Sequence, residues 1–186
     1  MPLSSPAPRQ SLHSRQVCCR GFRRDDGLWD IEGSLLDTKD YEFARRDLAG
    51  VHPVGAPVHA MLVRFTIDDQ FLLHDIEVAM DHTPFATCPR IAPEFAALTG
   101  LNLTSGFVKQ LRTRFGGVAG CTHLVDLMIA MATAAFQTVY PILSREKPAT
   151  GKPVIIDTCH ALAADGPVVA RIWPDYATGK PQDSST

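Results

Sequence analysis

The sequence predicts an α+β fold in which an antiparallel sheet carries helices on one face. Three observations support this prediction. Residues 28–80 contain segments that alternate apolar and polar side chains, as strands do. Residues 93–140 instead carry apolar side chains at helical spacing. Strands followed by helices along the chain favour an α+β arrangement over a doubly wound one.

Strands are predicted at residues 28–36, 60–67 and 71–80. In the first, Trp29 and Ile31 share one face, whereas Asp30 and Glu32 lie on the other. The second and third are separated by the turn-forming residues 68–70, so we expect them to pair as a hairpin.

Helices are predicted at residues 93–98, 104–115 and 122–140. Pro141 is expected to end the last one, because proline cannot donate a helical hydrogen bond. A joint follows at residues 144–152, which contain Pro148 and Gly151. Beyond it, residues 154–158 and 168–173 are expected to pair as strands.

The domain organisation follows from composition and length. Residues 1–16 are rich in proline and serine and are expected to form a flexible arm. Residues 177–186 are expected to form a flexible tail. Residues 17–176 are expected to form a single α+β domain, since 186 residues correspond to one domain.

Charge and hydropathy exclude several classes of partner. The 18 basic and 20 acidic residues give a formal net charge of −2, which argues against nucleic acid or an anionic membrane as a partner. The longest apolar stretch, residues 124–139, is interrupted by polar side chains, and residues 1–9 lack the apolar centre of a secretory signal. We therefore expect a cytoplasmic protein.

The strongest chemical feature is a glycine-rich loop, residues 116–120, that delivers Cys121 to the start of the predicted long helix. Unpaired N–H groups at a helix start stabilise a thiolate. His123, two residues further on, could hold a metal or move a proton. The alternative is structural: Cys121 is a buried thiol and Thr122 caps the helix.

Four side chains are candidate ligands for zinc or iron. His59 opens the predicted hairpin, Cys88 follows its far end, and both hairpin ends should lie at the same edge of the sheet. If the helix that begins near Cys121 packs over this edge, its cysteine and His123 join them. Mixed nitrogen and sulphur ligands are typical of zinc and iron sites.

Arginines, carboxylates and an aromatic residue gather in residues 20–33 and 37–39. One interpretation is a charged strand edge with internal ion pairs. The other is a polar ligand site. In that second interpretation Asp30 and Glu32 supply acid and base, and the substrate-binding residues are Arg23, Trp29, Lys39 and Arg64. No G-x-G-x-x-G or Walker-type run is found in the sequence, so no nucleotide cofactor is expected.

Four runs of the sequence are R-G-F-R-R-x-D-G-L-W-D-I-E-G, D-T-K-x-Y, G-x-P-x-H-x-M-x-V-R and G-G-x-x-G-C-T-H-L. Together they resemble a bacterial domain-of-unknown-function family, over about residues 16–175. Members of that family are often encoded beside genes for the catabolism of aromatic and hydroxycinnamate-type acids. The resemblance therefore implies an aromatic substrate.

A second resemblance concerns the order of features. A Gly55-Ala56-Pro57 loop, a hairpin, Cys88 and then a helix-opening Cys121 are similar to the core of U-type iron–sulphur cluster assembly scaffolds. In those scaffolds three cysteines form one metal site. Here His59 stands at or beside the first position, so the resemblance implies a fixed zinc or iron site or a metal-free pocket.

Two functions follow as expectations. The first is a small enzyme that breaks down an aromatic, phenylpropanoid or lignin-derived compound by lyase-type acid/base chemistry, with a homodimer as an open question. Its catalytic residues would be His59, Cys121, His123, Asp30 and Glu32. The second is a non-catalytic zinc or iron–sulphur binding module that serves a partner enzyme.

Overall fold

The computed structural model describes residues 3–46, 49–147 and 150–179. By their internal contacts the residues divide into two compact units, Met1–Leu143 and Ser144–Thr186, and each is described separately. The single domain predicted for residues 17–176 spans parts of both units and stays a prediction. The boundary falls at the predicted joint, residues 144–152, of which Pro148 lies outside the described residues.

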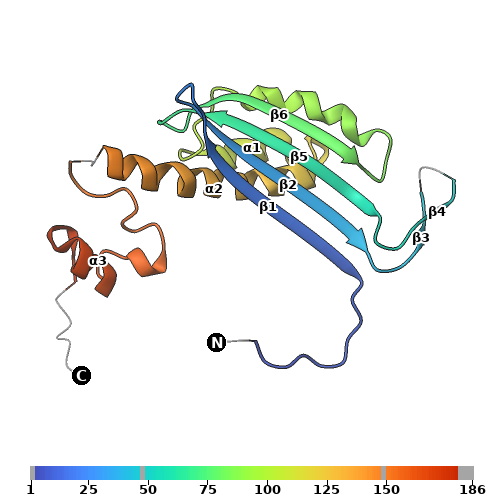
Figure 1. Ribbon diagram of the computed structural model, residues 1–186, viewed down its shortest axis with the longest axis horizontal. Coiled ribbons are helices and arrows are strands. Elements are labelled where there is room, and N and C mark those ends of the chain that lie inside the picture. Colours follow the sequence, from blue (N-terminus) through green and yellow to red (C-terminus); the bar gives the residue numbers. More distant parts are fainter. Residues whose placement is uncertain (1–2, 47–48, 148–149, 180–186) are drawn as a thin grey trace. The chain divides into compact units, whose positions relative to one another are not determined.

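The first unit contains a four-stranded antiparallel sheet in the order β1-β2-β5-β6 (Figure 1). Its strands are β1 (His13–Arg23), β2 (Trp29–Lys39), β5 (Pro57–Ile67) and β6 (Leu73–His82). A separate short pair, β3 (Phe43–Ala44) and β4 (Val51–His52), lies between β2 and β5 in sequence. The predicted α+β class is confirmed, but β1 was not predicted and begins inside the expected arm of residues 1–16.

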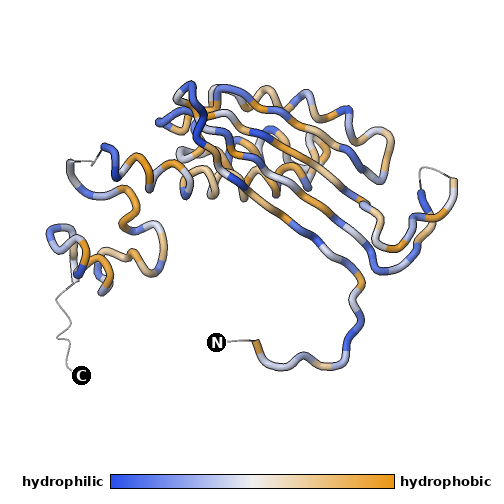
Figure 2. The backbone as a smooth tube through the Cα atoms, viewed as in Figure 1, coloured by the Kyte–Doolittle hydropathy of each residue, from blue (hydrophilic) through white to orange (hydrophobic). Residues whose placement is uncertain are grey.

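The two faces of the sheet differ in burial. On β2, Trp29, Ile31 and Leu35 are buried, whereas Asp30 and Glu32 between them are half-buried. Alternation along a strand sends successive side chains to opposite faces. Figure 2 shows the resulting change of hydropathy from residue to residue along the strands. Asp37 lies on the same face of β2 as these buried residues and is itself buried, with an exposed fraction of 2%.

Helices cover the buried face of this sheet (Figure 1). They are the 3-10 helix η1 (Cys88–Leu98), α1 (Phe107–Phe115), the 3-10 turn η2 (Gly117–Ala119) and α2 (Thr122–Glu146). Helix α2 approaches the strands closely, because a side chain at Gly33 would meet Met131 and one at Gly21 would meet Thr138. Glycine in these two strands thus lets the long helix sit against the sheet.

Helix α2 does not end before Pro141, as the sequence predicted, but continues to Glu146. Proline removes one helical hydrogen bond and crowds the preceding turn. The residues that follow it, Ile142 and Leu143, pack against the core of the first unit. Their burial offsets the lost hydrogen bond, which local propensity alone does not reveal.

By length and composition, α2 is the helix among the described residues that could cross a membrane. This is weak support for a span, since the core helix of a soluble protein passes the same test. Its residues Leu127, Met128 and Met131 are fully buried in the core cluster. The fold is consistent with a soluble domain.

The second unit is small and helical in its described part. It contains η3 (His160–Leu162), α3 (Pro167–Ile172) and η4 (Pro174–Tyr176) around the buried side chains of Ile156, Ala164 and Val169. The strand pair predicted at residues 154–158 and 168–173 is wrong. Pro167 occupies the first turn of a helix, a position that suits its fixed φ angle and missing N–H.

Candidate functional site

A row of three polar side chains crosses the sheet on its helix-covered face. Arg15 on β1 pairs with Asp37 on β2, and Asp37 pairs with His59 on β5. Residues directly opposite each other in antiparallel strands point to the same face. The register of three strands therefore places a guanidinium, a carboxylate and an imidazole side by side.

Asp37 is the centre of this row, with only 3% of its side chain exposed. Arg15 donates from Nε to Oδ1 and from its terminal nitrogen to Oδ2, both at 2.8 Å, which is a bidentate fork. His59 lies with Nδ1 2.9 Å from Oδ2, and His13 lies with Nε2 3.4 Å from Oδ1. Both carboxylate oxygens are thus engaged by side chains of the protein.

His123 comes from the first turn of α2 and completes the group from above the sheet. Its ring lies on the ring of His59, with centroids 3.8 Å apart and planes 31° apart. Its Nε2 is 3.8 Å from Oδ2 of Asp37. The His123 side chain is 28% exposed, compared with 13% for His59, so the site reaches solvent on the side of His123.

Cys121 opens α2, as the sequence predicted: its carbonyl oxygen accepts a hydrogen bond from the N–H of Val125 at 3.0 Å. Its Sγ lies 3.8 Å from Nδ1 of His123, within reach of a weak S–H donor. Gly117 in the preceding loop has φ of 59°, in the left-handed region that favours glycine. The loop thereby carries the thiol to the edge of the histidine pair.

Burial and neighbouring charges set the protonation states. Burial alone would raise the pKa of Asp37, but the hydrogen bond and charge of Arg15, together with His59, outweigh it and lower that pKa. Burial and the charge of His123 lower the pKa of His59, although Asp37 opposes them. Burial and the charge of Arg15 lower the pKa of His123. The site therefore favours an ionised carboxylate beside two neutral imidazoles.

One set of side chains in the described part of the chain could hold a metal ion. Ligand atoms of Asp37, His59 and His123 all lie within 4.8 Å of one another. Two of the predicted ligands, His59 and His123, belong to this group, and Asp37 is a third that the sequence reading missed. Cys88, which begins η1, and Cys121 are not members of it.

The predicted acid/base pair Asp30 and Glu32 lies elsewhere, because both residues have the opposite parity on β2 to Asp37 and face away from the helices. Asp30 accepts a hydrogen bond from Thr66 at 2.8 Å. Glu32 accepts hydrogen bonds from Arg64, which also donates to Glu77. The structure thus gives these charged side chains ion-pair and hydrogen-bond partners of their own, away from the two histidines.

The predicted substrate-binding residues are also dispersed. Trp29 is buried at the start of β2, where its Nε1–H donates to Asp69 at 3.0 Å and the Arg23 guanidinium lies 5.2 Å from its ring centroid. This is the opposite end of the strand from Asp37. Lys39, two residues beyond Asp37, is the predicted residue that lies nearest to the histidine pair along the sheet.

The fold and site together define a class: an α+β domain with a carboxylate–histidine cluster between the end of a sheet and the start of a helix. The chain belongs to the family described as protein of unknown function (DUF2889), whose profile matches residues 13–137. That match begins where β1 begins and includes Arg15, Asp37, His59 and His123. Comparisons with curated proteins and with solved structures gave no match. The resemblance to U-type scaffolds therefore stays a prediction.

Proposed function

We propose that the protein is a small enzyme that transfers protons at the cluster formed by Asp37, His59, His123 and Cys121. The observation that carries the proposal is the buried Asp37–His59 contact of 2.9 Å, beside which the ring of His123 lies tilted, with its centroid 3.8 Å from that of His59. A carboxylate that orients an imidazole is a recurrent arrangement for general acid/base catalysis.

His59 is the proposed base. An ionised Asp37 can only accept a hydrogen bond, so Nδ1 of His59 carries the proton and Nε2 keeps a free lone pair. The lowered pKa of His59 keeps the ring neutral near pH 7. Once Nε2 takes a proton from a substrate, the adjacent carboxylate stabilises the charged ring.

His123 and Cys121 are the proposed acid side of the site. The thiol can donate to Nδ1 of His123, and this leaves the other ring nitrogen protonated toward Asp37. Thiol and imidazole can then return a proton to a leaving group. The unpaired N–H groups at the start of α2 supply partial positive charge for a developing anion.

These parts suit a lyase-type elimination, which needs a base, an acid and a means of holding an anion. The family resemblance favours an aromatic substrate. The test is a panel of aromatic acids that carry a group which can be eliminated, followed by ultraviolet absorbance. Wild-type protein and His160→Gln, an exposed histidine in the second unit, should turn over the same compound. His59→Gln should reduce its rate at least about a hundredfold. An unchanged rate in His59→Gln would refute the assignment.

A metal-binding module is the second candidate, because Asp37, His59 and His123 bring three ligand atoms within 4.8 Å. Neutral imidazoles suit zinc or iron, since metal ligands must be deprotonated. The hydrogen bonds from Arg15 to both oxygens of Asp37 oppose metal binding, because the carboxylate already has a cationic partner. Elemental analysis decides between the two: one tightly held metal per chain, lost in His59→Gln but kept in His160→Gln, supports the module. Protein that melts identically with and without chelator supports the metal-free enzyme.

A further inference from the structure

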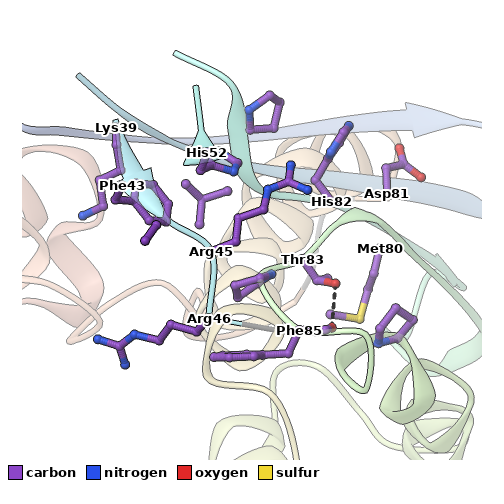
Figure 3. Close-up of a pocket in the computed structure, with 15 residues that line it drawn as sticks. Lys39, Phe43, Arg45, Arg46, His52, Met80, Asp81, His82, Thr83 and Phe85 are labelled. Atoms are coloured by element: carbon purple, nitrogen blue, oxygen red, sulfur yellow. Dashed lines mark hydrogen bonds between the residues drawn. The ribbon is translucent and has the colours of Figure 1, made fainter. Parts of the chain in front are cut away.

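We infer that a cavity at the Lys39 end of the sheet binds an organic anion with an apolar body. The cavity has a volume of about 520 Å³, within the range of small-molecule sites. Lining residues come from three stretches of the first unit: residues 39–46 and 52–58, on either side of the turn between β3 and β4, and residues 80–89, at and beyond the end of β6. Figure 3 shows side chains from these stretches around the same space.

The charge of the cavity is positive. Lys39, Arg45 and Arg46 line it, against a single carboxylate, that of Asp81. Among the described residues, the side chains of Arg45 and Arg46 form neither ion pairs nor hydrogen bonds. In Figure 3 the Arg45 side chain extends toward His82, whereas that of Arg46 extends away from it. Arg45 is therefore the cation best placed to receive an anionic group, and its planar fork matches a carboxylate.

The rest of the wall is apolar. Phe43 and Phe85 contribute aromatic rings, and the remaining apolar lining residues are Ala44, Pro57, Val58, Met80, Pro84 and Pro89. Phe43 is fixed in place because it stacks on His52, with ring centroids 4.8 Å apart. His52 in turn lies with Nε2 3.1 Å from the carbonyl oxygen of Ala56. A bare inorganic anion would leave these apolar surfaces in contact with water, whereas a flat apolar body would cover them.

The cavity lies close to the proposed catalytic cluster along two strands. Lys39 follows Asp37 by two residues on β2, and Val58 directly precedes His59 on β5. If the bound anion is the substrate, the inference rests on the proposed function, because the anion would then be anchored beside the histidine pair. Binding itself does not depend on turnover, so the two proposals can fail separately.

The test measures binding of three probes to the full chain by titration calorimetry: benzoate, the neutral analogue benzyl alcohol, and inorganic phosphate. Benzoate should bind saturably. Benzyl alcohol lacks the negative charge and phosphate lacks the apolar ring, so each should bind at least about tenfold more weakly. Arg45→Ala should weaken benzoate binding by a similar factor. Phe85→Ala, at a side chain that is 42% exposed, should weaken it several-fold without harm to the fold.

Arg112→Ala, at an exposed position on α1, is the matched control and should bind benzoate like wild type. His59→Gln should also retain binding, so its loss of turnover would be separate from ligand capture. Absence of saturable benzoate binding overturns the inference, as does equal weakening by Arg45→Ala and Arg112→Ala. If benzyl alcohol binds as tightly as benzoate, the cavity does not require an anionic group. If phosphate binds as tightly as benzoate, the cavity does not require an apolar body. Either result contradicts the proposal. If Arg45→Ala melts at the same temperature as wild type, its loss of benzoate binding is a local effect at the cavity.

Discussion

Asp37 and His59 are direct cross-strand neighbours on β2 and β5, and Nδ1 of His59 lies 2.9 Å from Oδ2 of Asp37. The contact is buried under the start of α2, where His123 covers it. A pair fixed by strand register needs no loop movement to form. The site is therefore pre-organised, as the proposed acid/base role requires.

Asp37→Asn should destabilise the first unit. The change removes the charge that holds the Arg15 fork and the His59 ring, so the free energy of unfolding should fall by about 1–3 kcal/mol. Urea unfolding measures this. Asp75→Asn, an exposed carboxyl on β6, should change it by less than about 0.5 kcal/mol. Equal stability of the two variants would show that the Asp37 contacts contribute nothing.

Stability should fall as the pH drops below 6.5, the ordinary pKa of histidine. The pKa values of His59 and His123 are lowered in the folded state, so just below this pH the unfolded chain binds more protons than the folded one. The contribution of these two residues is fully present above 6.5 and is lost as the pH falls. Melting temperatures across pH 5–8 test it.

The double variant His59→Gln/His123→Gln should flatten that pH dependence. The control variant is His160→Gln, which replaces an exposed histidine of the second unit, outside the site. Its stability should depend on pH as that of wild type does. If the stability of His59→Gln/His123→Gln falls with decreasing pH as steeply as that of wild type, other groups account for the pH dependence.

Arg15→Gln should raise the pKa of both site histidines, because the guanidinium charge lowers each of them. Histidine ring signals followed by NMR over a pH titration report the change. Arg20→Gln alters a charge on the same strand but on the opposite face of the sheet, so it should leave both values unchanged. Histidine pKa values that fall in Arg15→Gln would contradict the electrostatic account.

Gly33→Ala should destabilise the packing of α2 on the sheet by about 1–3 kcal/mol, since the added methyl group would overlap Met131 and press on Leu127. Ser34→Ala, one residue further along β2 and on the other face, should be nearly neutral. Chemical unfolding of both variants tests this. A Gly33→Ala protein as stable as wild type would show that the helix can move away at little cost.

Much of the sheet could be predicted, because period-two alternation is strong where one face is buried. Asp37 was also within reach of that pattern. It has the same parity as Ile31 and Leu35, and a charged residue in phase with a buried face needs a partner. The predicted strand, residues 28–36, ended one residue before it.

Arg15 was beyond such reasoning. β1 is an edge strand with mostly exposed side chains, so no alternation marks its beginning at His13. Its place beside Asp37 depends on register, which is a long-range property of the sheet. Cys121 shows the opposite case. The helix start that it opens is a local signal in the sequence, whereas the grouping of Asp37, His59 and His123 depends on tertiary packing.

The central claim is that His59 is a neutral base oriented by Asp37. Nitrogen NMR of protein labelled at its histidines measures it most directly, because ring shifts report both the tautomer and the pKa. The account predicts that at pH 7 His59 carries its proton on Nδ1, leaves Nε2 unprotonated and has a pKa below 6.5. A His59 that is doubly protonated at pH 7, or that carries its single proton on Nε2, would contradict the account.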